Sequence, residues 1–305
     1  MNLHGWIIYN GSLKGNKFLD FAEWIQSSAL KQGSTTSIYK NNELLVSLQT
    51  NELKILSDGS PKLPDYVVFA DKDIYLAKQL ELLRIPVFNP SRSIEISDDK
   101  IATFQELAKY DLPIPQTFVA PKVFMKGNTN LEDLHGVSEA LGFPLIMKEA
   151  FGSFGEQVYL IKDEKELMNK ALELQGKPYL YQEFISSSFG KDLRLHVVGD
   201  KVVAAMKRQS KNDFRANVSA GGSMQAYVPS AQEEKLAVAA TKAIGANFAG
   251  VDLLLGVDGQ PIICEINSNA HIRNMFDCTG INVADYIMQY ILMVLEHNKI
   301  GEDHA

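Results

Sequence analysis

The chain has 305 residues, of which 46% are hydrophobic and 22% charged, so it can form two or three domains around a substantial core. Its formal net charge of −7 argues against nonspecific nucleic-acid binding, which depends on neutralising phosphates. No stretch reaches the apolar length of a membrane span, and the first residues lack a secretion-signal pattern, so a cytoplasmic protein is expected. The two cysteines are too few for a disulfide framework and lack metal-type spacing.

The first part of the chain, residues 1–95, alternates predicted strands and helices. The apolar patterns predict strands over residues 6–9, 66–69 and 86–88, and helices over residues 18–30 and 73–83. This βαβ rhythm is typical of a small parallel sheet. Asn10 and Gly11 follow the first strand, where ligands bind in open α/β sheets, although they do not form the dinucleotide-binding fingerprint.

The second part, residues 96–183, contains a lysine strand beside a glycine-rich loop. Predicted helices cover residues 97–110, 133–141 and 163–174, and predicted strands cover residues 144–149, 157–161 and 179–185. Gly152, Ser153 and Gly155 lie between the first two strands, and such a turn lets backbone N–H groups approach phosphate oxygens. Lys148 alone is typical of a surface lysine. Together, the lysine strand and the loop predict a lid over phosphates.

The third part, residues 184–305, starts with a predicted hairpin over residues 192–198 and 201–208. A tight turn at Gly199-Asp200 would place Asp192 opposite Lys207, with Arg194 on the same face. A surface salt bridge would explain that pair without any function. Ser230 and Glu233 form a capping box for a helix that runs to about residue 247, and residues 281–296 predict a last amphipathic helix.

A second hairpin is predicted from residues 250–255 and 261–267, because both runs are apolar and Asp258-Gly259 lies between them. With a two-residue turn, Asp252 lies opposite Glu265, and Asn267 shares their face. A three-residue turn with a bulge would shift the register by one residue and break this pairing. Alternation places Cys264 on the opposite face from Glu265, which favours a core thiol.

Two carboxylates directly opposite each other repel, so they need a cation or a shared proton between them. Asp252, Glu265 and the Asn267 amide offer hard oxygen ligands of the kind that Mg²⁺ takes when it also holds phosphates. The alternative is a solvated strand end whose acids merely lie at the surface. Because three oxygen ligands share one face, the sequence predicts a magnesium site.

The order of these motifs resembles that of the ATP-grasp superfamily, and more narrowly the RimK-like carboxylate–amine ligases. The resemblance extends from about Ser97 to the last helix, while the N-terminal third agrees only in kind. It rests on the Lys148 strand, the glycine loop, Gln182-Glu183-Phe184-Ile185, Asp192-Leu193-Arg194, Asp213-Phe214-Arg215-Ala216-Asn217, Ala249-Gly250-Val251-Asp252 and Glu265-Ile266-Asn267.

This resemblance implies an α/β ATP-grasp fold with an N-terminal pre-ATP-grasp α/β domain (residues 1–95), a small lid subdomain (residues 96–183) and a large subdomain with the metal site (residues 184–305). It implies ATP and two Mg²⁺ ions as cofactors, and Mn²⁺ is expected to substitute for Mg²⁺. Implied nucleotide contacts are Lys100, Lys148, Gly152, Ser153, Gly155, Glu183, Phe184, Asp192, Arg215, Ala216 and Asn217, with Glu183 and Phe184 at adenine and Asp192 at the ribose. Arg208 matches a basic position near the transferred phosphate, and Asp252, Glu265 and Asn267 match the Mg²⁺ ligands.

The resemblance implies an ATP-dependent ligase that joins a small-molecule or peptide carboxylate to an amine, such as that of glutamate, through an acyl phosphate. Two alternatives stay open, an ATP-grasp phosphotransferase acting on a hydroxyl and a nucleotide-binding regulator without turnover. The sequence also leaves open whether the chain forms a homo-oligomer.

One departure concerns the substrate. Many relatives read Ala-Ser-Pro-Gly after the asparagine ligand, whereas this chain has Ser268 to Arg273 there. Arg273 could anchor a substrate carboxylate, and His271 could orient the amine or accept its proton near its ordinary pKa of about 6.5. If Arg273 does not bind the substrate carboxylate, the acceptor pocket is expected near Asn10 and Gly11.

Overall fold

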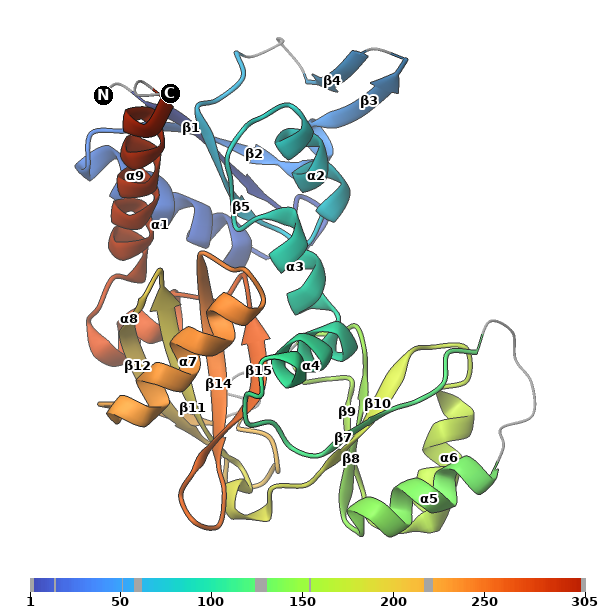
Figure 1. Cartoon of the computed structure of the whole chain (residues 1–305). Coiled ribbons are helices and arrows are strands. Elements are labelled where there is room, and N and C mark those ends of the chain that lie inside the picture. The colour runs from blue at the N-terminus through green and yellow to red at the C-terminus, as the bar shows by residue number, and fades with distance from the viewer. Residues whose placement is uncertain are drawn as a thin grey trace.

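The computed structural model of the chain contains three sheets of four or five strands, each with helices packed beside it, and a separate two-stranded sheet (Figure 1). It describes residues 3–13, 15–50, 52–57, 62–123, 131–153, 155–216 and 222–302, without the side chains of residues 131–133 and 299–302. The mixed α/β fold class predicted from the sequence is confirmed.

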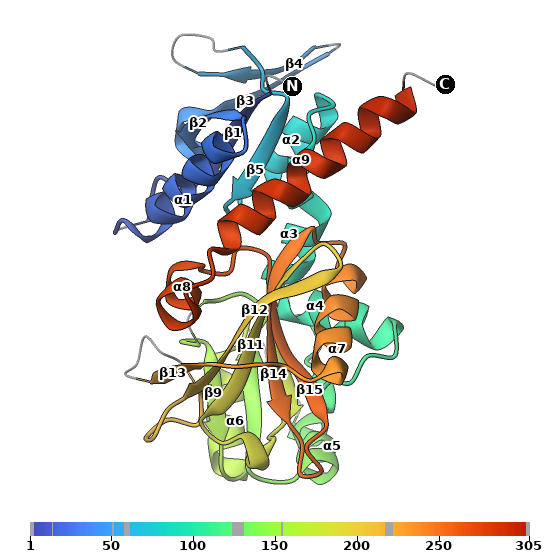
Figure 2. The ribbon, with the colours of Figure 1, turned by 90° about the vertical axis from the view of Figure 1, so that its left-hand side faces the viewer.

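The first sheet is parallel, as the βαβ rhythm predicted, and has the strand order β2-β1-β5-β6. Its elements are β1 (His4–Tyr9), α1 (Lys17–Lys31), β2 (Thr35–Lys40), β5 (Tyr66–Ala70), α2 (Ile74–Leu82) and β6 (Val87–Phe88). A short turn of helix, η1 (Asn41–Glu43), leads to the hairpin of β3 (Leu45–Gln49) and β4 (Glu52–Leu56). This hairpin projects from the first sheet and was not predicted (Figures 1 and 2).

Two helices lead from the first sheet to the second, α3 (Ser91–Asp98) and α4 (Lys100–Lys109). Asp99 begins α4 as its N-cap, because its carboxylate accepts hydrogen bonds from the backbone N–H groups of Ile101 and Ala102. The second sheet has the order β7-β10-β8-β9. Its elements are β7 (Thr117–Val119), α5 (Leu131–Leu141), β8 (Leu145–Glu149), β9 (Val158–Ile161), α6 (Glu164–Glu173) and β10 (Tyr179–Glu183).

The third sheet is antiparallel and has the order β13-β12-β11-β14-β15. Its elements are η2 (Ser186–Ser188), β11 (Lys191–Val198), β12 (Lys201–Gln209), β13 (Ser223–Ala226), α7 (Ala231–Ala243), β14 (Phe248–Leu255), β15 (Pro261–Asn267) and α8 (Arg273–Thr279). The predicted capping box at Ser230 and Glu233 is confirmed, and α7 packs on one face of this sheet.

The last helix, α9 (Val283–Glu302), returns from the third sheet to lie along α1 (Figures 1 and 2). The Ser28 hydroxyl on α1 donates a 2.6 Å hydrogen bond to Asp285 on α9. One buried apolar cluster includes Ile25 of α1, Met288 of α9 and Met206 of β12. The first and third parts therefore share a core, which holds the first sheet next to the end of the third.

Within the described residues, no single helix combines the length and apolar composition of a membrane span. One pair, Arg273–Thr279 with Val283–Asn298, meets that test jointly but is bent by 117°.

Candidate active site

A cavity of about 590 Å³ lies where the three sheets meet. Residues from all three predicted domains line it. Among them are fifteen residues that the sequence analysis selected: Lys100, Lys148, Gly152, Ser153, Gly155, Glu183, Phe184, Asp192, Arg208, Arg215, Ala216, Asp252, Glu265, Asn267 and His271. The cavity thus brings together residues up to 264 positions apart in the chain, counted from Asn10 to Asn274.

The hairpin of β14 and β15 carries the predicted metal ligands, and its turn differs from the prediction. Gly256 pairs with Gln260 through a 2.9 Å hydrogen bond, so the turn has three residues rather than two. A bulge next to Leu253 and Ile263 then adds one residue to β15 and restores the pairing of Asp252 with Glu265. The predicted turn is wrong, but the predicted carboxylate pair is confirmed because the bulge offsets the turn.

The same bulge changes the position of Cys264. It is the extra residue that the ladder skips, and it lines the cavity together with Glu265. The prediction that the two side chains face opposite ways is therefore wrong. Burial raises the pKa of the Cys264 thiol to about 11, so the thiol stays protonated and unreactive at neutral pH.

The hairpin of β11 and β12 also contains a bulge, between His196 and Val197. This bulge shifts the register by one residue and places Asp192 opposite Arg208 rather than opposite Lys207. The predicted Asp192–Lys207 pair is wrong. Arg208 instead donates two hydrogen bonds, of 2.7 and 2.5 Å, to the Asp192 carboxylate. Asp192 and Arg208 both line the cavity.

Asp252 is the most enclosed acid of the site, with a side chain only 4% exposed. Arg194 donates to both carboxylate oxygens at 2.7 and 2.6 Å, and Arg208 donates to one of them at 2.8 Å. Burial alone would raise the pKa of Asp252, but Arg194 and Arg208 outweigh burial and lower it to about 2. The carboxylate is therefore charged at every physiological pH.

The residues present fit a bound Mg²⁺ ion. Three of the roughly four lone-pair sites of the Asp252 carboxylate accept hydrogen bonds, which leaves one for a metal. The buried Nδ2 of Asn267 has no hydrogen-bond partner among the described residues, so those residues do not fix the orientation of this amide. In the described part of the chain, no three His, Cys, Asp or Glu side chains form a metal-binding group. A metal site here would therefore depend on the Asn267 amide oxygen as third ligand.

Two lysines face the acids from the second sheet and its leading helix. Lys148 on β8 is only 6% exposed, and its ammonium lies 5.4 Å from the centre of the Phe104 ring. Lys100, the first residue of α4, donates a 3.2 Å hydrogen bond to the Gly152 carbonyl. Burial lowers the pKa of Lys100, whereas the charge of Glu265 opposes that shift. The two ammonium groups lie on one side of the cavity, where they can bind negatively charged phosphate oxygens.

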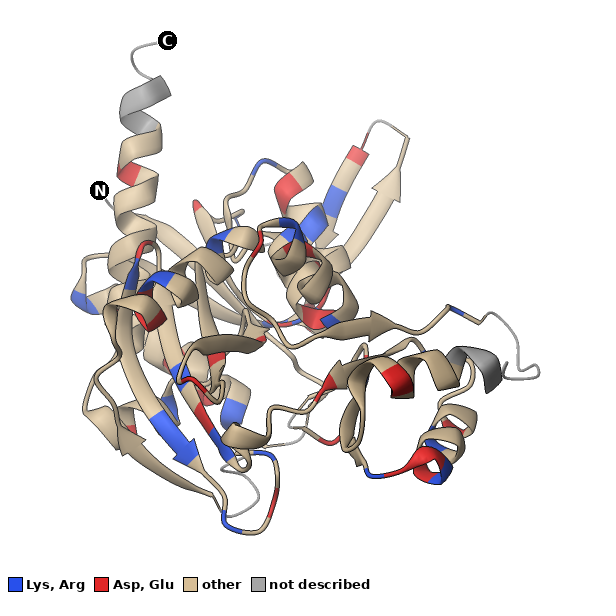
Figure 3. Ribbon diagram, turned by 60° about the horizontal axis from the view of Figure 1, so that its bottom comes forward, with Lys and Arg blue, Asp and Glu red and all other residues tan. Residues whose placement is uncertain are grey.

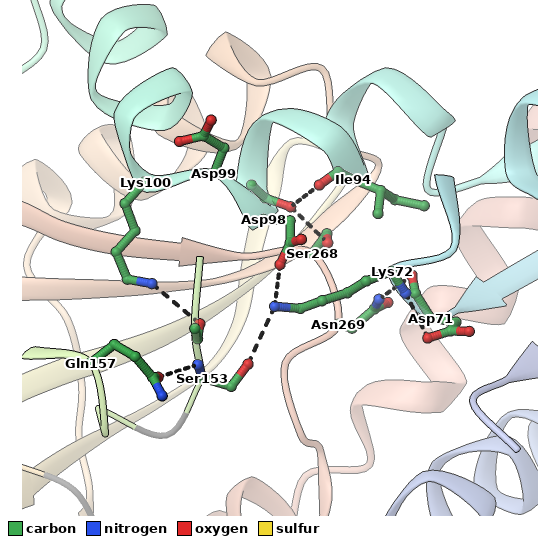
Figure 4. Close-up of polar contacts among 12 residues, drawn as sticks. Asp71, Lys72, Ile94, Asp98, Asp99, Lys100, Ser153, Gln157, Ser268 and Asn269 are labelled. Carbon is green, nitrogen blue, oxygen red and sulfur yellow. Dashed lines mark hydrogen bonds and ion pairs between the residues drawn. The ribbon is translucent and has the colours of Figure 1, made fainter. Parts of the chain in front are cut away.

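The glycine-rich loop is tied to all three parts of the chain. The Lys100 ammonium donates to the Gly152 carbonyl, and the Arg215 guanidinium of the third part donates to the Gly155 carbonyl. The Lys72 ammonium of the first part contacts both Asp98 and the Ser153 hydroxyl (Figure 4). Gly152 and Gly155 have φ values of 148° and 73°, which disfavour residues with a side chain. The loop conformation therefore depends on both glycines.

Replacing both Gly152 and Gly155 by Val is expected to lower product formation more than nucleotide binding. Valine disfavours both backbone conformations, so the loop can no longer close over the cavity and exclude water. The ratio of ADP released to coupled product should rise in the double variant. Gly142→Val, at a positive φ outside the cavity, is the matched control, and an unchanged ratio in the double variant would reject the role as a lid.

Three apolar residues, Phe184, Phe214 and Ala216, line a part of the cavity that we call its apolar end. The rings of Phe184 and Phe214 lie 6.5 Å apart at a steep angle, and Ala216 is buried beside them. Glu183 is exposed and accepts a 3.2 Å hydrogen bond from the Gln116 backbone. The predicted contact Asn217 lies outside the described residues.

Arg273 does not line the cavity. As the first residue of α8 it donates hydrogen bonds from Nε and Nη2 to the two carboxylate oxygens of Asp20 on α1, and its guanidinium lies 4.5 Å from the centre of the Trp24 ring. The prediction that Arg273 faces an acceptor site in this cavity is wrong, because its guanidinium links α8 to α1. His271 does line the cavity, at its N-terminal side.

The expectation that His271 titrates near neutrality is also wrong. Burial, followed by the nearby charge of Lys17, lowers the pKa of its ring to about 4. Between pH of about 6.5 and 4 the unfolded chain binds the proton more tightly, so the free energy of unfolding should fall as the pH is lowered through this window. Denaturant titrations should show a shallower fall for His271→Gln, and identical slopes would contradict the burial of this ring.

Several cavity residues were not selected from the sequence. Arg194 was placed only on the same face as the predicted Asp192–Lys207 pair, and no role was predicted for Lys17, Asp71, Lys72 or Asn269. The position of Asp71, two residues after the end of the predicted strand over residues 66–69, was the available signal, because ligands bind at the carboxyl ends of parallel strands. Acidic and basic positions are interspersed over all three parts of the ribbon (Figure 3).

Comparison with known proteins gives consistent matches. The family model described as a RimK-like ATP-grasp domain matches residues 97–291. A probable alpha-L-glutamate ligase 2 of Shewanella amazonensis is 38% identical over 224 residues, which cover 72% of this chain and 71% of that protein. Human N-acetylaspartylglutamate synthase A is 31% identical over 243 residues, which cover 79% of this chain but only 61% of the relative.

A solved structure supports the fold of nearly the whole chain. The ATP-grasp ligase PsnB, complexed with a phosphomimetic variant of its minimal precursor, Mg and ADP, superposes with a TM-score of 0.69 at 17% identity. The superposition covers 96% of this chain and 98% of that one. It extends the likeness to the N-terminal sheet, which the family model does not include.

Proposed function

Because the chain belongs to the RimK-like ATP-grasp family, we propose that it is an ATP-dependent ligase that joins a carboxylate to an amine. The observation that carries this proposal is the pair of opposed acids, Asp252 and Glu265, beside the two lysines Lys100 and Lys148 in one cavity. A phosphate-transfer site needs this combination, since lysines and metal ions must neutralise the phosphate oxygens, and the acids must bind the metal ions.

The nucleotide would occupy the cavity from the apolar end to the acids. Phe184 and Ala216 would contact adenine, and Glu183 would lie at its edge. Lys148 and Lys100 would hold the phosphates from one side, and the Gly152–Gly155 loop would cover them. Asp192 is proposed to contact the ribose, and it could do so only with oxygens that already accept hydrogen bonds from Arg208.

Asp252, Glu265 and Asn267 would hold Mg²⁺, which supplies positive charge at the phosphate oxygens when bound. Two ions, with Mn²⁺ as a substitute, are part of this proposal. Arg194 and Arg208 both contact the Asp252 carboxylate and are permanently charged, so they can stabilise the negative charge that develops on the transferred group.

The reaction would proceed in two steps. A carboxylate oxygen of the substrate attacks the γ-phosphorus, the bond to ADP breaks, and an acyl phosphate forms. The amine nitrogen then attacks the acyl carbon, the carbon–oxygen bond to phosphate breaks, and the amine loses a proton. Closure of the glycine loop would keep water from hydrolysing the acyl phosphate.

The substrates proposed here follow the names of the relatives. We propose that the amine belongs to an amino acid such as glutamate and that the carboxylate belongs to a small molecule or a peptide. We also propose the cytoplasm as the place of action, because the reaction consumes ATP.

A screen for ADP release over pairs of amino acids, small carboxylates and short peptides, with mass spectrometry of the products, tests this function. The ligase account expects ADP and phosphate in equal amounts and a product that has lost one water relative to its two substrates. A phosphorylated product without released phosphate would indicate the phosphotransferase alternative. Nucleotide binding without any turnover would indicate a regulator.

A further inference from the structure

The N-terminal side of the cavity contains a buried carboxylate that the proposed chemistry does not use. Asp71 follows β5 directly, is only 5% exposed and lines the cavity. Its Oδ1 accepts two hydrogen bonds, from the Asn10 amide at 3.0 Å and from the Lys72 backbone at 2.7 Å. Its Oδ2 is also buried, yet among the described residues it has no hydrogen-bond partner.

Asn269 presents a second free acceptor at the same place. Its Nδ2 donates a 2.8 Å hydrogen bond to the Asp71 backbone carbonyl. A carbonyl only accepts, so this contact identifies which end of the amide is the nitrogen. The other end, Oδ1, is buried without a partner among the residues that the structure describes. Figure 4 shows Asn269 beside Asp71 and Lys72.

The amide of Asn10 is oriented in the same way, and its oxygen already accepts a hydrogen bond. Asn10 donates its Nδ2 to Asp71 and accepts the Ser12 backbone N–H with its Oδ1 at 3.0 Å. The Lys72 ammonium is bound to Asp98 and to Ser153 at 3.3 Å, on the glycine-loop side. Among the described residues here, the buried oxygens without a hydrogen-bond partner are one charged acceptor, Asp71 Oδ2, and one neutral acceptor, Asn269 Oδ1.

Leaving buried acceptors unpaired is unfavourable, and for a charged oxygen the penalty is larger. Burial accordingly raises the pKa of Asp71, and the hydrogen bond from Asn10 opposes that shift. A ligand that supplies several N–H donors and a positive charge would satisfy both oxygens together. A primary ammonium group has these properties.

We propose that Asp71 and Asn269 bind the ammonium group of the amine substrate. This assignment rests on the ligase function proposed above and gives the N-terminal domain a role in choosing the amine. Asn269 is two residues from Asn267, so their Cα atoms are at most about 7 Å apart. The ammonium would therefore bind close to the predicted metal ligands and to the acyl carbon that it attacks after losing a proton.

The test is Asp71→Asn. Asparagine keeps the acceptor oxygen for Asn10 and Lys72 but replaces the free charged oxygen by a donor. The KM for the amine should rise about tenfold or more, because a charge-assisted contact to the bound ammonium is lost, while the KM for ATP should change little. The melting temperature should stay the same or rise, because a buried charge has been removed.

Asp73→Asn is the matched control. It removes one negative charge two residues away, outside the cavity, and asparagine also caps helices well. This variant should keep the amine KM of the wild type. Asn269→Ala is a second test of the site and should raise the amine KM by a smaller factor. An amine KM in Asp71→Asn that equals the wild-type value would overturn the proposal.

Failure of the ligase function can be separated from failure of this site. If the wild type releases ADP but forms no amide, calorimetry with L-glutamate decides the matter, with N-acetyl-L-glutamate as the ligand that lacks an ammonium group. Binding of L-glutamate that is lost in Asp71→Asn would support an ammonium site in a protein of another activity. Equal binding to both proteins, or no binding to the wild type, would reject it.

Discussion

Asp252→Asn is expected to abolish magnesium-dependent ADP formation and also to lower the free energy of unfolding by about 3 kcal/mol. The repulsion between Asp252 and Glu265 alone would predict a more stable variant. The structure reverses this expectation, because the Asp252 carboxylate neutralises Arg194 and Arg208, whose side chains are only 17% and 10% exposed. Asparagine would leave Arg194 without its carboxylate partner and would leave Arg208 with Asp192 alone. Denaturant unfolding and a coupled ADP assay measure the two effects.

Glu265→Gln is the matched control, because it removes the other proposed metal ligand without breaking a described ion pair. It should abolish ADP formation as well, but its free energy of unfolding should stay within about 1 kcal/mol of the wild-type value. Wild-type ADP formation in both variants at low magnesium concentration would reject the metal site. Equal stability of the two variants would reject the proposed role of Asp252 as partner of the arginines.

Lys148→Met is expected to weaken ATP binding by about 1.5–3 kcal/mol, which corresponds to a roughly 10- to 100-fold larger Kd. Lys148 lies in a strand whose five residues are all buried, and its ammonium has an aromatic ring and no described carboxylate at bonding distance. Methionine keeps the length of the side chain and removes a buried charge. The variant should therefore fold as stably as the wild type.

Calorimetric titration with ATP measures this loss of affinity directly. Lys165→Met, on the exposed side of α6, removes the same charge from the same part of the chain and should leave the Kd unchanged. An unchanged Kd in Lys148→Met would show that the phosphates bind elsewhere in the cavity.

The sequence predicted those parts of the fold whose signals are local. The strand that carries Lys148, the helix capped by Ser230 and the apolar arms of the last hairpin all appear close to their expected bounds. The hairpin of β3 and β4 was missed, since its leucines are exposed and do not follow the alternation of a half-buried sheet. The short helix α8 likewise has too few residues for a periodic pattern.

Pairing and orientation were less predictable, because single residues change them. One bulge in β15 preserved the predicted acids, and another between His196 and Val197 exchanged Lys207 for Arg208 as the partner of Asp192. No local sequence signal marks either bulge. Arg273 was expected at the cavity because of its distance along the chain from Asn267, but Asp20 and Trp24 on α1 hold it outside. Such contacts arise from packing between distant segments.

The transfer of oxygen from the carboxylate substrate to phosphate tests the central claim most directly. The substrate carries the heavy stable isotope of oxygen in its carboxylate, and mass spectrometry follows the released phosphate. Because the acyl phosphate breaks at its carbon–oxygen bond, the account predicts one labelled oxygen in each phosphate released with an amide. Released phosphate without the label, alongside amide formation, would contradict an acyl phosphate and with it the proposed mechanism.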